Sequence, residues 1–283
     1  MVEVGDLLYI GRYLATGADD ASVYLEVQSK TTTEVCCVAH NDAKLDGLLT
    51  VFHMERDEKG IANKSNTQDL FSKSDVEWIK AIAAEFDIDF LSLSYTRHSE
   101  DVLEARNFLN DMGLDSCKVV AKLDAKQSLI NFRGILNAAD GIMLSRGNLG
   151  LDCLPEKVSV IQKNVTTSCN LVGKPCVVTR IMDSMVNAPR PTRAEATDVA
   201  NAVLDGADCL MLGAETLRGL DPANAVKTVV QCCQAAENEF NHTQHFDYLM
   251  REAMKAEDTG ILVPGASSPP LEFLFTRVAF LCE

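Results

Sequence analysis

Several short apolar stretches of the chain end in residues that could do chemistry. The residues found at those ends are Ser94, Lys122, Asp124, Arg146, Gly147, Asn148, Thr179, Arg180 and Glu215. In parallel α/β folds the carboxyl ends of the strands meet at one edge of the sheet, and ligands bind there. These residues are therefore predicted to share one site.

The stretch KVVAKLD places Lys122 two residues before Asp124. If the stretch is a strand, both side chains point the same way. A lysine inside an apolar strand is costly to bury without a partner. Two interpretations stay open: the residues form a structural ion pair, or the lysine faces a substrate anion beside a metal-binding carboxylate.

The stretch DGIMLSRGNLG, residues 140–150, reads as a strand followed by a tight glycine turn. Glycines at 147 and 150 allow such a turn and bring backbone N–H groups close to a ligand. The side-chain oxygen of Asn148 suits a hard cation such as Mg²⁺. A plain turn between a strand and a helix explains this stretch equally well.

The stretch PRPTRAEATDVANAVL contains a clear helix start. Thr192 and Glu195 have the spacing of a capping box, so a helix is predicted to begin there. Arg190 and Arg193 do not suit the positive end of a helix dipole. We therefore expect these arginines to serve a contact elsewhere.

A regular alternation of strand and helix must position the candidate residues. Five short apolar runs are each followed by a helical pattern, and they occupy residues 88–94, 117–123, 140–145, 175–179 and 208–213. Runs without polar alternation are typical of parallel strands covered by helices. The rhythm predicts about five βα units of a (β/α)8 barrel, although a doubly wound open sheet would have a similar one.

The flanking segments do not show this alternation of strand and helix. Residues 1–56 contain four short apolar runs separated by turn-like stretches and read as all-β, and residues 57–72 read as a polar linker. A helix follows from about residue 73, with Ser74 or Asp75 as its cap. Two more helical patterns lie within 221–257, and residues 258–283 form no recognisable unit.

Composition and charge narrow the function classes. The net charge of −15 argues against nucleic acid or an anionic membrane as the main partner. The ten cysteines include no CxxC pair, which favours small buried side chains in a reducing compartment over a disulfide framework. Neither a signal peptide nor a transmembrane stretch is visible, so a cytoplasmic location is the default expectation.

Taken together, several blocks resemble the pyruvate kinase family. They are FLSLSYTR, DGIMLSRGNLG, GKPCVVTRIMDSM and PRPTRAEATDVANAVLDGADCLMLGAET, in the family's order and spacing. SRGNLG, VTRIMDSM and GAETLRG look most like the cytosolic plant members. The resemblance implies a (β/α)8 barrel with an inserted β-rich lid domain. On that basis residues 1–56 are part of the lid, 73–240 part of the barrel, and 241–283 a divergent remnant of a C-terminal domain.

The resemblance also implies an activity, which is phosphoryl transfer from phosphoenolpyruvate to ADP, giving pyruvate and ATP, with Mg²⁺ and K⁺. Lys122 matches the lysine that stabilises the transferring phosphoryl group, and Asp124 and Asn148 match the Mg²⁺ ligands. The positions that match the substrate pocket are Ser94, Gly147, Asn148 and Thr179, and Thr179 also matches a residue on the proton route. A homo-oligomer, a tetramer in the family, is implied as well.

The sequence departs from the family pattern in three ways. Asn148 stands where many relatives have Asp, and Asp124 where the family usually has Glu. The pair then contributes −1 to the metal, and weaker Mg²⁺ binding is expected. The family's N-terminal segment, which contains most K⁺ ligands and an N-F/M-S-H motif, has no counterpart in residues 1–87, and the C-terminal domain looks cut short.

These departures lead to an expectation about activity. We expect the 283 residues alone to be weakly active or inactive as a pyruvate kinase. One alternative is an incompetent fragment that acts by joining full-length subunits. Another is a different metal-dependent barrel enzyme, such as a class II aldolase, which RGNLG and PRPTRAE argue against.

Overall fold

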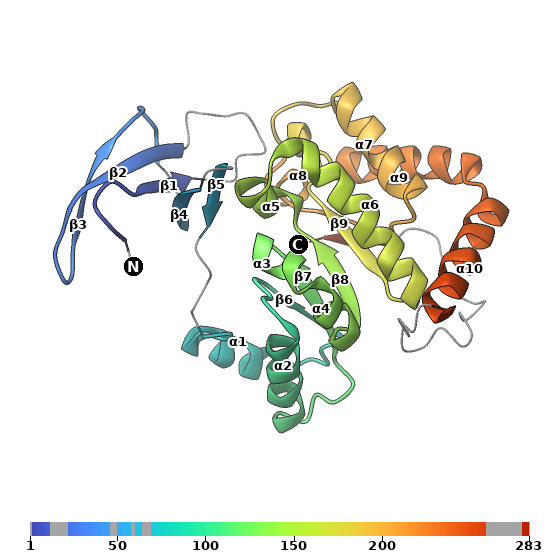
Figure 1. Cartoon of the computed structure of the whole chain (residues 1–283). Helices are drawn as coiled ribbons and strands as arrows, with labels where there is room; N and C mark the ends of the chain where they lie inside the picture. The colour runs from blue at the N-terminus through green and yellow to red at the C-terminus, as the bar shows by residue number, and fades with distance from the viewer. Residues whose placement is uncertain are drawn as a thin grey trace.

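A computed structural model describes residues 2–11, 22–45, 50–57, 60–63, 69–258 and 279–282 (Figure 1). Its larger sheet has six strands in the order β11-β10-β9-β8-β7-β6. Their bounds are β6 Phe90–Leu93, β7 Lys118–Leu123, β8 Gly141–Leu144, β9 Cys176–Thr179, β10 Cys209–Leu212 and β11 Ala279–Cys282. All the described strand pairings in this sheet are parallel. The five predicted strands are therefore confirmed.

The helices between these strands follow the predicted alternation. Their bounds are α1 Lys73–Ala83, α2 Ser99–Asp111, α3 Lys126–Ile130, α4 Phe132–Ala138, α5 Arg146–Asp152, α6 Pro155–Val172, α7 Arg193–Leu204 and α8 Ala214–Leu217, with the 3-10 helix η3 at Asp183–Val186. Further along the chain, α9 Pro222–Glu239 and α10 His242–Asp258 match the two helical patterns predicted within 221–257.

Two features of the sheet favour part of a barrel over a doubly wound sheet. From β6 to β10 each strand lies beside the next one in the sequence, without the reversal of strand order that a doubly wound sheet has. The main helical packing is on one set of alternating strand residues, which includes Leu123, Leu144 and Leu210. The fold is therefore the α/β barrel type, with about five of its units described.

The other set of alternating residues forms a separate, smaller cluster. Met143 of β8, Val177 of β9 and Met211 of β10 are buried together there, with Val120 of β7 against them. Side chains that fill the inside of a barrel come from neighbouring strands in this way. Lys122 and Thr179 follow Val120 and Val177 by two residues, so strand alternation places them on the same inner face.

The N-terminal region forms a five-stranded antiparallel sheet with the order β3-β2-β1-β4-β5. Its strands are β1 Leu7–Gly11, β2 Ser22–Lys30, β3 Val35–Ala39, β4 Thr50–Asp57 and β5 Gly60–Asn63. For the described residues of this region, the all-β prediction is confirmed. The stretch 57–72, predicted as a linker, contains strand β5. This segment is a strand because its backbone pairs with β4 and extends the sheet. It also contacts α5 of the barrel region (Figure 1).

The predicted helix starts are right in one case and displaced in the other. Thr192 caps α7 and forms the expected capping box with Glu195. The cap of α1 is Ser72, and the prediction of Ser74 or Asp75 was wrong. Asp75 instead completes the box, because its carboxylate accepts from the Ser72 backbone N–H at 2.8 Å. A capping box formed with Asp is shorter than the usual Glu version, which explains the error.

Within residues 258–283, predicted to form no unit, the structure describes one strand. The backbone of β11 pairs in parallel with β10, from Ala279 beside Cys209 to Cys282 beside Leu212. The prediction was therefore wrong for these four positions. The C-terminal strand adds to the sheet at the β10 edge, on the opposite side from β6.

Lys174 joins the end of α4 to the loop before β9. Its Nζ donates to the carbonyl oxygens of Leu136 at 2.7 Å, Asn137 at 3.0 Å and Ala139 at 2.7 Å. These carbonyls lie at the C-terminal end of a helix, where no N–H group of the helix donates to them. Lys174 therefore replaces the hydrogen bonds that the end of α4 lacks.

Replacement of Lys174 by methionine is expected to lower the free energy of unfolding by about 2 kcal/mol, because it removes three hydrogen bonds from a charged donor. Urea denaturation measures this loss. The matched control is Lys163→Met, because Lys163 is exposed and ion-paired with Asp205. The control should change stability by less than about 1 kcal/mol. Equal effects of both variants would contradict the special role of Lys174.

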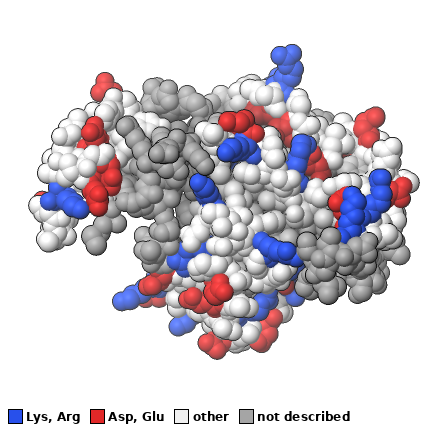
Figure 2. Space-filling view, viewed as in Figure 1, with Lys and Arg blue, Asp and Glu red and all other residues white. Residues whose placement is uncertain are grey.

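Within the described residues, no helix has the length and apolar character needed to cross a membrane. Figure 2 shows acidic and basic side chains interspersed over the visible face. The cysteines whose side chains are described are free thiols, and five of them are buried, namely Cys117, Cys169, Cys176, Cys209 and Cys233.

Candidate functional site

A small pocket lies at the carboxyl ends of β7 to β10, where the sequence predicted a site. It has a volume of about 80 Å³. Its lining consists of Lys122, Ser145, Gly147, Asn148, Thr179, Arg180, Met211, Leu212, Gly213 and Ala214. Of the six residues to which the family resemblance assigns a role in the site, four are in that lining. Asp124 is bonded to one of them, and Ser94 is outside.

Lys122 and Thr179 reach the pocket from the inner face of the sheet. Lys122 pairs in register with Met143 of β8, and its side chain lines the pocket. No ion pair joins Lys122 to Asp124 among the described residues, and the interpretation as a structural pair is therefore wrong. Thr179 is buried, and its hydroxyl donates to the carbonyl of Leu144 at 3.2 Å.

Asp124 and Asn148 form the acidic side of the site. Asp124 is 2% exposed, and its carboxylate accepts from the backbone N–H of Tyr95 at 2.8 Å and from Asn148 Nδ2 at 2.6 Å. The remaining amide oxygen, Asn148 Oδ1, is buried without a hydrogen-bond partner. Leaving a buried acceptor unpaired costs about 1–3 kcal/mol, so a ligand for this oxygen is expected.

This donor set fits a hard divalent cation. Mg²⁺ prefers oxygen ligands, and protein sites commonly supply one or two of them while water and substrate supply the others. Asp124 offers a charged oxygen beside the free oxygen of Asn148. No group of three or more His, Cys, Asp or Glu side chains suited to a metal occurs in the described part of the chain. Asp124 and Asn148 would supply two ligands of such a cation, and other groups would complete its coordination.

Gly147 lies in a helix, so the prediction of a glycine turn was wrong. Residues Arg146–Asp152 form α5, with Gly147 as its second residue. Leu149 of this helix is fully buried in the main core, and that packing offsets the low helix propensity of glycine. A Cβ at position 147 would meet Arg180 Nε at 3.2 Å. The absence of a side chain thus allows the arginine to lie across the helix start.

Arg180 is a pocket residue that the sequence analysis did not single out for a role. It lines the pocket, and its Nη1 lies 3.3 Å from Asp183 Oδ1. Burial raises the pKa of Asp183, and the nearby Glu215 and Glu195 add to this, although Arg180 opposes it. Arg180 has a φ angle of 63°, a conformation that the sequence does not reveal. In the sequence, the position of Arg180 directly after Thr179 was the feature that could have indicated a role in the pocket.

The other strand-end residues lie around the pocket. Ser94 is exposed after β6 at the sheet edge, and it does not line the pocket. The next residue, Tyr95, reaches the site through its backbone bond to Asp124. Glu215 of α8 is 1% exposed and accepts from the N–H of Gly213 through Oε2 at 3.1 Å, while its Oε1 is buried without a hydrogen-bond partner among the described residues.

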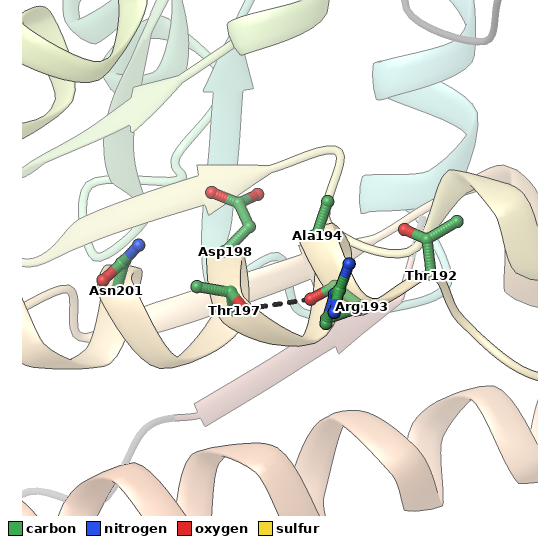
Figure 3. A pocket seen from close by; sticks show the side chains of 6 residues that line it. All are labelled: Thr192, Arg193, Ala194, Thr197, Asp198 and Asn201. Atoms are coloured by element: carbon green, nitrogen blue, oxygen red, sulfur yellow. Dashed lines mark hydrogen bonds between the residues drawn. The ribbon is translucent and has the colours of Figure 1, made fainter.

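A second hollow lies on the surface of α7 (Figure 3). It is lined by Thr192, Arg193, Ala194, Thr197, Asp198 and Asn201. Thr197 bonds back to the carbonyl of Arg193 along the helix at 2.9 Å. This hollow is formed by consecutive turns of one helix and does not bring together the candidate residues. The pocket at the strand ends is therefore the candidate site.

Comparison with known proteins identifies the family of the chain. A family model described as "Pyruvate kinase, barrel domain" matches residues 2–226. The rice protein "Pyruvate kinase 2, cytosolic" is 48% identical over 87% of this chain and 45% of its own length. "Pyruvate kinase" of Dictyostelium discoideum is 37% identical over 82% of this chain and 44% of its own length. The chain spans about half the length of these curated relatives.

Solved structures give the same result. The crystal structure of Cryptosporidium parvum pyruvate kinase matches 99% of this chain and 60% of its own chain, with a TM-score of 0.80 and 26% identity. A second pyruvate kinase structure from the same organism has a TM-score of 0.74 over the same shares. The likeness therefore includes nearly the whole described fold.

Proposed function

Because the chain belongs to the pyruvate kinase family, we propose that its pocket binds phosphoenolpyruvate and ADP and transfers the phosphoryl group to give pyruvate and ATP. The observation that supports this most is the convergence of Lys122, Asp124, Asn148 and Thr179 at one end of the sheet. Phosphoryl transfer depends mainly on positioning and on positive charge around the transferring group. The pocket has side chains for both purposes.

Lys122 is proposed as the cation for the transferring phosphoryl group. It extends from the inner face of β7 into the pocket, and Arg180 places a second cation there. A charge held in a partly buried site acts more strongly than one in water, because the surroundings screen it less. The two cations therefore offset the charge of an anionic substrate in a protein with an acidic overall balance.

Asp124 and Asn148 are proposed to hold Mg²⁺. A bound Mg²⁺ supplies positive charge to substrate oxygens and orients them. The buried, unpartnered Oδ1 of Asn148 supports its role as a ligand, and the bond from Asn148 Nδ2 to Asp124 keeps the two side chains together. K⁺ is proposed from the family alone.

Thr179 and Gly147 are proposed to contact the organic part of the substrate. The Thr179 hydroxyl is directed at the Leu144 carbonyl and lies at the pocket wall, where it can relay a proton through water. Gly147 is in the first turn of α5, where backbone N–H groups have no acceptor within the helix. An N–H at that position suits a substrate carboxylate. Ser94 is proposed as a peripheral contact near the phosphate.

The N-terminal sheet is proposed to act as part of a lid. Its strand β5 contacts α5, the helix that contains Gly147 and Asn148 (Figure 1). A β domain in that place can limit the access of water to the pocket. A homo-oligomer and a cytosolic location are proposed from the family, since the rice relative is named cytosolic.

A coupled assay tests the proposed activity. Purified protein is supplied with phosphoenolpyruvate, ADP, Mg²⁺ and K⁺, and pyruvate is measured through its reduction by lactate dehydrogenase. We expect weak pyruvate formation, slower than that of a full-length relative, which requires ADP and Mg²⁺. Pyruvate formation that is independent of ADP, or that remains after Mg²⁺ is removed, would contradict the proposal.

A further inference from the structure

Arg146 uses its guanidinium group to hold the backbone that follows β9. Its Nε donates to the carbonyl oxygen of Thr179 at 3.0 Å, and its Nη2 donates to the carbonyl oxygen of Arg180 at 2.5 Å. Both carbonyls belong to residues that line the pocket, whereas Arg146 itself does not line it. The side chain of Arg146 is 13% exposed, so solvent does not compete strongly for these bonds.

The opposite side of the guanidinium group is anchored by two helices. Its Nη1 donates to Asp198 Oδ1 at 2.7 Å, and its Nη2 lies 2.7 Å from Asp198 Oδ2, a two-point contact to α7. Its Nη1 also donates to Gln162 Oε1 of α6 at 3.2 Å. A planar group with acceptors on both sides has little freedom to move. Arg146 therefore connects α5, α6 and α7 to the end of β9.

The backbone held in this way is strained. Arg180 has a φ angle of 63°, and a left-handed conformation costs a residue with a side chain about 1–2 kcal/mol. Such a conformation persists only when the surrounding structure fixes it. The Thr179 carbonyl belongs to the peptide unit before the Arg180 Cα, and the Arg180 carbonyl to the peptide unit after it. The two bonds from Arg146 therefore hold both peptide units that set the φ and ψ angles of Arg180. They supply that constraint.

We propose that Arg146 is a positioning residue, which fixes Thr179 and the strained Arg180 so that both side chains face the pocket. The inference that this improves catalysis rests on the proposed phosphoryl transfer. A small displacement of groups that position a substrate can cost about 100-fold in rate. A lysine cannot replace Arg146, because it has one nitrogen and cannot reach two carbonyls and a carboxylate in the same plane.

The test compares Arg146→Lys with a matched arginine at the other end of the sheet. Arg106 of α2 donates to the carbonyl of Ala138 at 3.1 Å and pairs with Asp140 at 2.9 Å, just before β8. Arg106→Lys therefore removes the same kind of contact away from the pocket. Hydrogen exchange of residues 177–186 is measured by mass spectrometry, together with kcat and KM in the coupled assay.

Arg146→Lys is expected to speed exchange at residues 179–184 and to lower kcat by about 10- to 100-fold, with a smaller change in KM. Arg106→Lys is expected to leave exchange there unchanged and to alter kcat by less than about twofold. Unchanged exchange at residues 179–184 in Arg146→Lys would overturn the proposal. Faster exchange with unchanged kcat would overturn the catalytic part of it.

Two outcomes need a further measurement, namely failure of Arg146→Lys to fold and failure of the unmodified protein to form pyruvate. If Arg146→Lys does not fold, Asp198→Asn weakens the anchor while the guanidinium group remains, and the same shift in exchange is expected at smaller size. If the unmodified protein forms no pyruvate, the proposed function fails. The exchange measurement still decides whether Arg146 holds the Thr179–Arg180 backbone.

Discussion

Replacement of Lys122 by methionine is expected to lower kcat for pyruvate formation by about 10³-fold, since it removes a preorganised positive charge from the transferring group. Methionine keeps most of the length of the side chain and is compatible with the apolar cluster on the inner face of the sheet. The loss should therefore be in the chemical step, and the melting temperature should not fall. The coupled assay measures kcat and KM for both proteins.

Lys118→Met is the control for this variant. Lys118 is the first residue of the same strand, is exposed, and lies at the end of β7 away from the pocket. The two variants change the net charge equally, so any difference between them reports on position. Comparable kcat values for Lys118→Met and Lys122→Met would remove Lys122 from the proposed chemistry.

The second large effect is expected for Asn148→Asp. Without metal, the new carboxylate would face the buried carboxylate of Asp124, to which Asn148 Nδ2 now donates at 2.6 Å. Uncompensated buried charge costs about 3 kcal/mol, so the metal-free variant should be less stable by about that amount. With Mg²⁺ the second negative charge becomes favourable. The variant should therefore gain more stability from Mg²⁺ than the unmodified protein does.

Thermal unfolding over a series of Mg²⁺ concentrations measures both parts of this prediction. Above its Kd, each tenfold increase in the Mg²⁺ concentration adds about 1.4 kcal/mol to the free energy of unfolding of the protein that binds it. Asn107→Asp, on the exposed surface of α2, makes the same change in charge and should show neither effect. A variant at position 148 that is stable without Mg²⁺ and indifferent to its addition would exclude this residue from a metal site.

Much of the barrel region could be predicted from the sequence, because its signals are local. The runs that became β8, β9 and β10 are buried at every position, which is why they lack polar alternation. The capping box at Thr192 is a contact between residues three apart, so it is visible in the sequence. Lys122 and Thr179 could be placed at a common site because parallel strands end at one edge.

The features that were missed depend on contacts between distant residues. Helix α5 contains two glycines, and it is the burial of Leu149 in the core that stabilises it. The positive φ angle of Arg180 is fixed by Arg146, which is distant in sequence. Strand β5 forms by pairing with β4, although its own stretch reads as polar. No local pattern contains this information.

The expectation that these 283 residues turn over weakly by themselves stays a prediction. So do the boundaries 1–56, 73–240 and 241–283 and the assigned roles of the site residues. The coupled assay compares the rate with that of a full-length relative such as the rice enzyme. Turnover near that of the relative would contradict the expectation.

The most direct test of the site is a binding measurement that does not require turnover. Oxalate resembles the planar anion that remains when phosphoenolpyruvate loses its phosphoryl group, and isothermal titration calorimetry measures its binding with and without Mg²⁺. We predict Mg²⁺-dependent binding to the unmodified protein and to Lys118→Met, and binding weakened by about tenfold or more in Lys122→Met. Equal affinity in all three proteins, or no binding to any of them, would contradict a pyruvate kinase site in this pocket.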